Sequence, residues 1–145
     1  MAFRAVTGEL KTGRYQIQNV QTGQFLELPT SDDNEPVINA LQHPAEKQKW
    51  DVFECGAGTY KLKNWGQGLW ANVARKPQLG SAVICKLAEK QFVIEESRTP
   101  GQYRIFMDET ELYWILSSGN LGSSITLGRQ GDNRNLWSFW TTSRP

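Results

Sequence analysis

The sequence predicts an all-β fold in which three similar units close around one common axis. A phrase of glycine, any residue and tyrosine returns at residues 13–15, 58–60 and 101–103, and the copies lie 45 and 43 residues apart. A repeat of this length is one supersecondary unit that cannot bury its apolar face alone, so the units must share a core. No window of ten or more residues carries a helical apolar period. We therefore expect one all-β domain over residues 1–145, with repeats at about 13–57, 58–100 and 101–142.

Each repeat contains four short segments in which apolar and polar residues alternate between turn residues, which is typical of β-strands. The twelve expected strands lie at 15–18, 25–28, 37–40 and 50–53 in the first repeat, at 60–63, 69–73, 82–85 and 92–94 in the second, and at 103–106, 112–116, 124–127 and 136–140 in the third. Closing the three units into a barrel removes the strand edges that an open sheet would expose. A pseudo-threefold barrel is the expected architecture.

Composition and charge narrow the possible partners. The 145 residues are 39% hydrophobic and include six Trp, six Phe and four Tyr, which suffices for one core. Sixteen basic and fifteen acidic side chains are spread along the chain, so no basic patch for nucleic acid is expected. No apolar run is long enough for membrane insertion, and the N-terminal residues lack the apolar stretch of a signal peptide. We expect a cytoplasmic protein that binds neither nucleic acid nor membrane.

Catalytic and metal-binding patterns are missing from the sequence. The one histidine, His43, has no second histidine or cysteine-rich partner nearby, and we interpret it as an exposed loop side chain. The acidic run at 32–35 lacks the alternating ligands of a calcium loop. Cys55 and Cys85 are interpreted as two reduced, packed thiols, because the chain shows no secretion signal. We expect a non-enzyme without metal or cofactor.

The end of each repeat resembles the Gln-x-Trp motif of one family. The first repeat ends in Gln48-Lys-Trp50, the third in Asn135-Leu-Trp137, and the second in the degraded Glu89-Lys-Gln-Phe92. With the repeats, this resembles the small intracellular β-trefoil proteins of mushrooms, over residues 13–141. The family includes ricin-B-like lectins and related trefoil protease inhibitors. The resemblance implies a β-trefoil with twelve strands, Trp50 and Trp137 in its core, and a non-catalytic role in fungal defence.

The resemblance also implies where a sugar would bind. Ricin-B-like pockets combine an Asp on the second strand, an aromatic residue after the third strand and an Asn just before Gln-x-Trp. The first repeat offers Glu27, residues 41–43 and Lys47 instead, and none of the three standard pockets survives intact. This argues against galactose recognition in the ricin manner.

A lectin site elsewhere is the favoured hypothesis, because the chain has more aromatic residues than a barrel interior needs. In a strand only alternate residues face inward, so some rings must lie near the surface. Exposed indoles form stacking faces for sugar rings. The expected sugar-binding residues are Trp65, Trp70, Asn72, Tyr113 and Trp114. The partners would be glycans or glycoproteins.

A protease inhibitor that presents a surface loop is the alternative hypothesis. The segment 29–36 is bounded by prolines, which lower the ordering cost of binding, and it carries Asp33, Asn34 and Glu35. A second loop offers Arg75 and Lys76. Either loop would take a serine or cysteine protease as partner.

A homodimer is also possible from the sequence. Trp140 and the neighbouring strand around Trp137 could form a self-association patch. Several sites or a dimer would give a weak sugar site useful avidity.

Overall fold

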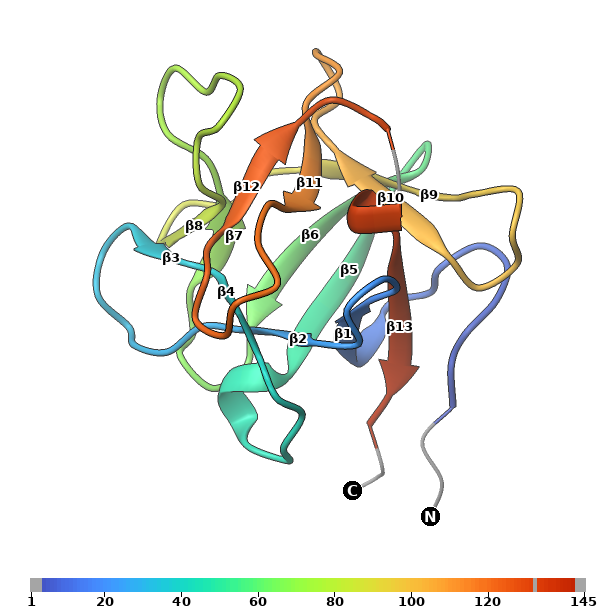
Figure 1. The fold of residues 1–145 in the computed structure, drawn as a ribbon, viewed down its shortest axis with the longest axis horizontal. Helices are drawn as coiled ribbons and strands as arrows, with labels where there is room; N and C mark the ends of the chain where they lie inside the picture. Colours follow the sequence, from blue (N-terminus) through green and yellow to red (C-terminus); the bar gives the residue numbers. More distant parts are fainter. Residues whose placement is uncertain (1–3, 132, 143–145) are drawn as a thin grey trace.

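The computed structural model describes residues 4–131 and 133–142. These residues form thirteen strands and two single-turn 3-10 helices (Figure 1). The elements are β1 (Gly13–Asn19), β2 (Phe25–Glu27), β3 (Glu35–Pro36), β4 (Ile38–Ala40), η1 (Glu46–Gln48), β5 (Trp50–Gly56), β6 (Thr59–Asn64), β7 (Trp70–Asn72), β8 (Ile84–Lys86), β9 (Phe92–Glu96), β10 (Tyr103–Phe106), β11 (Tyr113–Leu116), β12 (Ile125–Gly128), η2 (Asn133–Asn135) and β13 (Trp137–Thr141). The all-β prediction is confirmed.

Six of these strands close into a barrel. Going round the ring, β1 pairs with β5, β5 with β6, β6 with β9, β9 with β10, β10 with β13, and β13 with β1, each time antiparallel. Each repeat contributes its first and last strand to this ring. Closure leaves the barrel strands without a free edge, as expected for three units that cannot stand alone.

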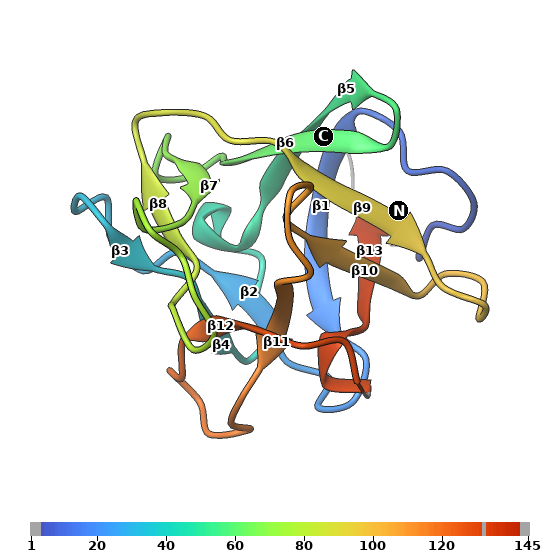
Figure 2. The same ribbon diagram turned by 90° about the horizontal axis from the view of Figure 1, so that it is seen from above.

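The remaining strands form three hairpins that cap one end of the barrel, as the view from above shows (Figure 2). The hairpins meet at the pseudo-threefold axis through a closed triangle of backbone hydrogen bonds. The N–H of Val37 donates to the carbonyl of Val83 (2.9 Å), Val83 donates to Ile125 (2.8 Å), and Ile125 donates to Val37 (2.9 Å). The three side chains are fully buried. This triangle makes the repeats equivalent in space and defines a β-trefoil.

One short strand that the sequence did not predict, β3, lies just before the expected strand at 37–40, which is observed as β4, and this gives thirteen strands in place of twelve. In the first repeat the segment around Val37 changes partner: β3 pairs with β8 of the second repeat, and β4 pairs with β2 of its own hairpin. Pro36 has no backbone N–H, and the N–H of Val37 is used in the axial triangle. The ladder is therefore interrupted at this point.

The three repeat tyrosines close the other end of the barrel. Their hydroxyls donate to backbone carbonyls of the N-terminal segment 8–11: Tyr15 to Lys11 (2.6 Å), Tyr60 to Leu10 (2.7 Å) and Tyr103 to Gly8 (2.5 Å). Burial raises the pKa of Tyr103 to about 12, with a smaller effect from Glu96, so its hydroxyl stays protonated and keeps donating at neutral pH. The repeated phrase in the sequence thus holds the N-terminal segment across the barrel.

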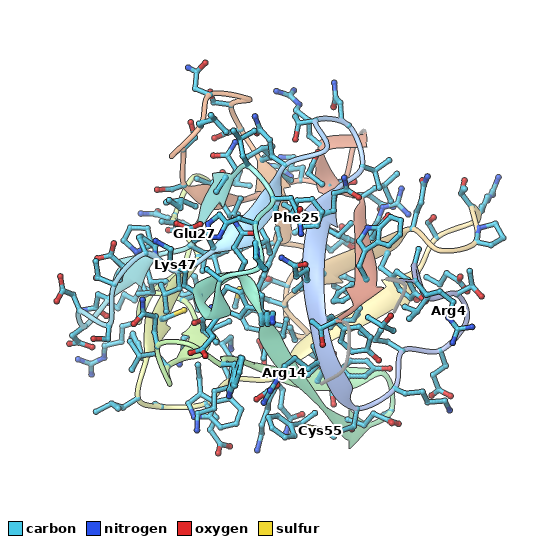
Figure 3. All side chains as sticks on the ribbon, turned by 90° about the horizontal axis from the view of Figure 1, so that it is seen from below. Arg4, Arg14, Phe25, Glu27, Lys47 and Cys55 are labelled. Atoms are coloured by element: carbon cyan, nitrogen blue, oxygen red, sulfur yellow. The ribbon has the colours of Figure 1, made fainter. Side chains whose placement is uncertain are left out.

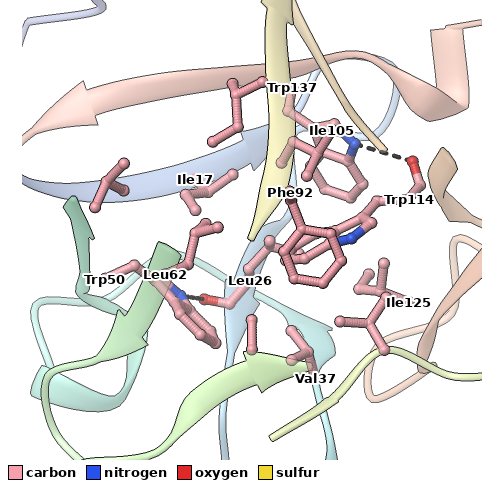
Figure 4. Packing of buried hydrophobic residues seen from close by; sticks show 14 of the residues in the cluster. Ile17, Leu26, Val37, Trp50, Leu62, Phe92, Ile105, Trp114, Ile125 and Trp137 are labelled. Atoms are coloured by element: carbon pink, nitrogen blue, oxygen red, sulfur yellow. Dashed lines mark hydrogen bonds between the residues drawn. The ribbon is translucent and has the colours of Figure 1, made fainter. Parts of the chain in front are cut away.

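The core between the two ends contains the last apolar residue of each repeat motif. Trp50, Phe92 and Trp137 are fully buried, as predicted for the two tryptophans (Figure 4). The Trp50 indole N–H donates to the carbonyl of Leu26 (3.3 Å), and the Trp137 indole donates to that of Trp114 (3.1 Å). Leu26 and Trp114 occupy matching positions in the first and third repeats. The similarity between these repeats therefore includes the hydrogen bonds of individual side chains.

The expectation that Trp114 lies near the surface is wrong. Its side chain is fully buried, and its ring stands edge-on to Phe92 with 5.1 Å between centroids (Figure 4). Phe92 stands in the second repeat where the other two repeats carry the buried Trp50 and Trp137, so the Trp114 indole packs against a ring of another repeat. Tyr113 is buried as well and packs on Phe106 with 4.6 Å between centroids. Neither residue offers an open face to a sugar.

The two cysteines differ sharply in environment. Both thiols are free; Cys55 is exposed at the end of β5, whereas Cys85 is buried on β8. Burial, with a smaller effect from Glu35, raises the pKa of Cys85 to about 12.

This difference predicts selective labelling. At pH 8 a thiol with a pKa of about 12 is thiolate in only about one molecule in ten thousand, and only the thiolate attacks a disulfide reagent. We expect a chromogenic disulfide reagent to release one equivalent of thiolate from the folded protein and two in denaturant. Labelling of Cys55→Ser should be at least a hundredfold slower than labelling of Cys85→Ser. Two fast equivalents from the folded protein would contradict the burial of Cys85.

Candidate functional site

A polar cluster lies on the outer side of the first-repeat hairpin and is formed by Glu27, His43, Lys47 and Gln48; we call it the Glu27 cluster. Glu27 ends β2, His43 follows β4, and Lys47 and Gln48 belong to η1. Gln48 Nε2 donates to Glu27 Oε1 (3.0 Å), and His43 Nε2 lies 3.2 Å from the same oxygen. Lys47 Nζ lies 3.6 Å from Glu27 Oε2. Figure 3 shows Glu27 and Lys47 next to each other.

Gln48 organises the cluster from below. It is fully buried, and its amide N–H groups donate to Glu27 and to the carbonyl of Leu41 (2.7 Å). Its amide oxygen accepts from the backbone N–H of His43 (3.1 Å) and from Gln16 Nε2 (3.2 Å). These bonds use the whole capacity of the amide, as a buried polar group requires. Gln48 therefore fixes both the carboxylate and the loop that carries His43.

The hydrogen bonds of the His43 ring also indicate its tautomer. The backbone N–H of Ala45 donates to His43 Nδ1 (3.2 Å), so this nitrogen is the acceptor and the ring proton resides on Nε2. Nε2 then donates to Glu27 Oε1. Because Oε1 already has two donors, Oε2 is the oxygen that remains for a ligand, with Lys47 beyond hydrogen-bond distance.

The side chains of the cluster differ in their exposure to solvent. The side chain of Glu27 is 9% exposed, whereas those of His43 and Lys47 are 41% and 40% exposed. Glu27 is thus nearly buried, and the two side chains beside it are partly exposed. Such an arrangement can bind a pair of neighbouring hydroxyls: one hydroxyl donates to Glu27 Oε2, and the other accepts from Lys47.

The standard pocket positions of the first repeat therefore come together after all. The substitutions change the residue types, but Glu27, His43 and Lys47 keep a common location around Gln48. Sequence reasoning missed this because it judged each position by identity and interpreted His43 as an isolated loop side chain. The available signal was Gln48, whose buried amide needs partners on both neighbouring segments.

Trp65 lies at the surface, as expected from the turn between β6 and β7, and is 39% exposed. The Arg14 guanidinium covers one face of its indole at 3.9 Å from the ring centroid. Arg14 is itself held by Asp51 at 2.6 Å. One face of the ring is thus occupied by a protein cation.

Trp70 and Asn72 lie on β7 at the positions that match Phe25 and Glu27. Trp70 is half-buried and packs against Phe53, with 5.7 Å between centroids. Asn72 Nδ2 donates to the carbonyl of Ala88 (3.0 Å) and borders an open hollow of about 530 Å³. The structure does not join Trp65, Trp70, Asn72, Tyr113 and Trp114 into one site, because the last two are enclosed in the third repeat.

The two proposed inhibitory loops are exposed at their tips. Asn34 adopts a left-handed backbone conformation (φ 64°), and its N–H donates to the carbonyl of Cys85 (3.0 Å). Glu35 pairs with Cys85 in β3, and Asp33 is exposed beside them. Arg75 and Lys76 lie exposed between β7 and β8.

The two tryptophans of the suggested self-association patch differ in burial. Trp137 is fully buried and cannot contact a second chain. Trp140 is half-buried, and its indole N–H donates to Gln18 Oε1 (2.8 Å).

Neither a metal site nor a membrane span emerges from the part of the chain that the structure describes. Within residues 4–131 and 133–142, no group of three or more His, Cys, Asp or Glu is placed to hold a metal ion. In the same residues, no helix has the length and apolar character needed to cross a bilayer.

Fold and site together describe a β-trefoil whose first repeat carries a hydrogen-bonded polar cluster. Comparison with known families gives the same class: the model of the ricin-type beta-trefoil lectin domain-like family matches residues 2–86. The chain belongs to this family. A search of curated protein sequences found no match.

Solved structures show the same fold at low sequence identity. The designed threefold-symmetric protein ThreeFoil has a TM-score of 0.82 and 19% identity, covering 88% of this chain and 97% of its own. The Rhizoctonia solani agglutinin has a TM-score of 0.82 and 20% identity, covering 90% of this chain and 95% of its own. The ricin B-like lectin of Macrolepiota procera, solved in complex with lactose, has a TM-score of 0.79 and 20% identity, covering 94% of this chain and 98% of its own.

Proposed function

We propose that this protein is a non-catalytic carbohydrate-binding lectin that takes glycans or glycoproteins as partners, with the Glu27 cluster as its sugar site. The observation that carries the proposal is the carboxylate oxygen Glu27 Oε2. The Glu27 side chain is 9% exposed and lies between His43 and Lys47, whose side chains are 41% and 40% exposed, and the fully bonded Gln48 amide holds the other carboxylate oxygen. Membership of a lectin family supports the same conclusion.

A vicinal diol fits this arrangement better than an anion does. In a vicinal diol, one hydroxyl can donate to Glu27 while its neighbour accepts from Lys47. An anionic ligand would have to approach a carboxylate that is only partly balanced by its neighbours. Since Gln48 and the His43 loop are already held by hydrogen bonds, little ordering cost remains for binding.

A glycan array with the purified protein tests the proposal. We expect binding to neutral glycans in the wild type and loss of that binding in Glu27→Gln. Trp65→Ala and Trp70→Ala, run on the same array, determine whether the aromatic surface predicted from the sequence contributes. An array without signal, or a Glu27→Gln profile equal to the wild type, would exclude the Glu27 cluster as the sugar site.

Protease inhibition is the second candidate, supported by the form of the loop at 29–36. Asn34 is anchored to the carbonyl of Cys85, and the N–H of Glu35 donates to the carbonyl of Asp32 (3.2 Å), so the exposed tip is held in one conformation. A held loop binds a protease cleft at low entropic cost. A panel of serine and cysteine proteases tests this candidate, with Asn34→Ala and the double variant Arg75→Ala, Lys76→Ala. Inhibition unchanged by both would exclude the two loops.

A further inference from the structure

A second hollow lies beside the Glu27 cluster, on the outer side of β1. Its volume is about 280 Å³, and it is lined by Gln16 and Gln18 of β1, Phe25 of β2, Gln42 after β4, and Trp140 of β13. We call it the Trp140 hollow. Gln16 and Trp140 face each other in the pairing of β1 with β13, so barrel and hairpin both contribute walls.

The walls of the Trp140 hollow are fixed by hydrogen bonds. The Trp140 indole N–H donates to Gln18 Oε1 (2.8 Å), and Gln18 Nε2 donates to the carbonyl of Gly23 (3.1 Å). Gln42 Nε2 donates to Gln16 Oε1 (3.2 Å). The indole therefore keeps one orientation before any ligand arrives, which lowers the cost of binding.

The lining specifies the chemistry of an occupant. Two aromatic rings and three amides form the walls, and no ionised side chain is among these lining residues. A neutral ligand with one apolar face and several hydroxyls meets these groups best, because its apolar face can lie on the indole while the hydroxyls bond to the remaining hydrogen-bonding positions of the Gln18 and Gln42 amides. The volume is at the lower end for ligand pockets, which suits a single ring. A neutral pyranose combines these properties.

The Trp140 hollow and the Glu27 cluster are adjacent. Phe25 and Glu27 lie two residues apart on β2 and face the same side, which places them about 7 Å apart along the strand. In the view of Figure 3, the labelled side chains of Phe25 and Glu27 lie near each other. Gln16 joins the two places directly, since its Nε2 donates to Gln48 Oε1 (3.2 Å) and to the carbonyl of His43 (3.0 Å).

We infer that the Trp140 hollow is a second sugar subsite, which holds the neutral pyranose linked to the one that the Glu27 cluster binds. This inference rests on the proposed function and makes it more specific: the surface recognises a disaccharide unit rather than a single sugar. It also gives Trp140 a role that its half-buried position outside the core does not explain.

Titration of the 15N-labelled protein with four disaccharides tests the inference. The probes are lactose, N-acetyllactosamine, cellobiose and chitobiose. Each is compared with the monosaccharide that forms its non-reducing end. We expect at least one disaccharide to shift the Trp140 indole N–H signal, which is identified by its loss in Trp140→Phe. That disaccharide should bind about tenfold more tightly than its monosaccharide, which corresponds to about 1.4 kcal/mol.

Variants separate the two subsites. Trp140→Ala should remove the tenfold advantage while leaving monosaccharide affinity unchanged. Gln42→Ala removes an exposed side chain that also lines the Trp140 hollow, and it should reduce the disaccharide advantage by a smaller factor. It replaces Trp140→Ala in this test if that variant does not fold. Phe53→Ala, which removes an exposed ring from β5, is the matched control and should bind as the wild type does.

The outcomes distinguish this inference from the proposed function. Disaccharide binding that is unchanged in Trp140→Ala and Gln42→Ala but lost in Glu27→Gln would overturn the second subsite and leave the lectin intact. Absence of a Trp140 shift with all four disaccharides would also overturn it. If the glycan array is empty as well, the proposed function is wrong too.

Discussion

Replacement of Trp50 by alanine is expected to lower the free energy of unfolding by about 3–5 kcal/mol. The indole is fully buried at the junction of barrel and hairpin, and its N–H donates to the carbonyl of Leu26. Truncation would leave a cavity and also a buried carbonyl without its donor. A domain of this size has only about 5–15 kcal/mol of stability, so the loss is a large fraction of it.

Urea denaturation followed by circular dichroism measures this loss as a shift of the midpoint at constant slope. Trp65→Ala is the control, because the same residue type is removed from a site that is 39% exposed and stacks on Arg14. The control should cost less than about 1 kcal/mol. Equal losses in the two variants would contradict the placement of Trp50 in the core.

Replacement of Glu27 by glutamine should weaken sugar binding by roughly 10- to 150-fold, since a hydrogen bond to a charged group contributes about 1.5–3 kcal/mol. The substitution keeps the size of the side chain but removes the negative charge. One position of the new amide must then be an NH₂ group, which faces either the Lys47 ammonium or the Gln48 and His43 donors. The acceptor for a sugar hydroxyl is weakened in both orientations.

Isothermal titration calorimetry with the best glycan from the array provides the measurement. Glu89→Gln is a matched control, because Glu89 is a half-exposed carboxylate paired with Lys61 at 2.5 Å in the second repeat. Its affinity should equal that of the wild type. A Glu27→Gln protein that folds normally and binds within threefold of the wild type would show that the sugar binds elsewhere.

The strand pattern of the sequence was sufficient to predict most of the strands, but not the points at which a segment changes its pairing partner. Periodicity and turn residues predicted the segments, and the tyrosine phrase predicted their grouping into three. The additional strand β3 was not predictable, because it forms only by pairing with β8 of another repeat. Alternation also failed at Tyr113 and Trp114, where both faces of the strand are covered.

The candidate site was less predictable than the fold. Exposed tryptophans were expected from composition, and Trp65 confirms that an indole lies at the surface. The Glu27 cluster was rejected on residue identity, although its members are held together by the single turn of η1 and the buried amide of Gln48. Sugar recognition depends on where donors and acceptors point, and this is a property of the hydrogen-bond network.

The sequence by itself determined that three similar units must share one apolar core, because each carries a strand pattern and an aromatic residue that it cannot bury alone. Only the tertiary structure decided which aromatic rings remain accessible and which polar side chains converge. Trp114 packs against Phe92 of another repeat, and the environment of Glu27 depends on a loop some twenty residues away, which Gln48 holds against it. Volume and hydrogen-bond capacity are satisfied between segments, so they become visible only when the segments are in place.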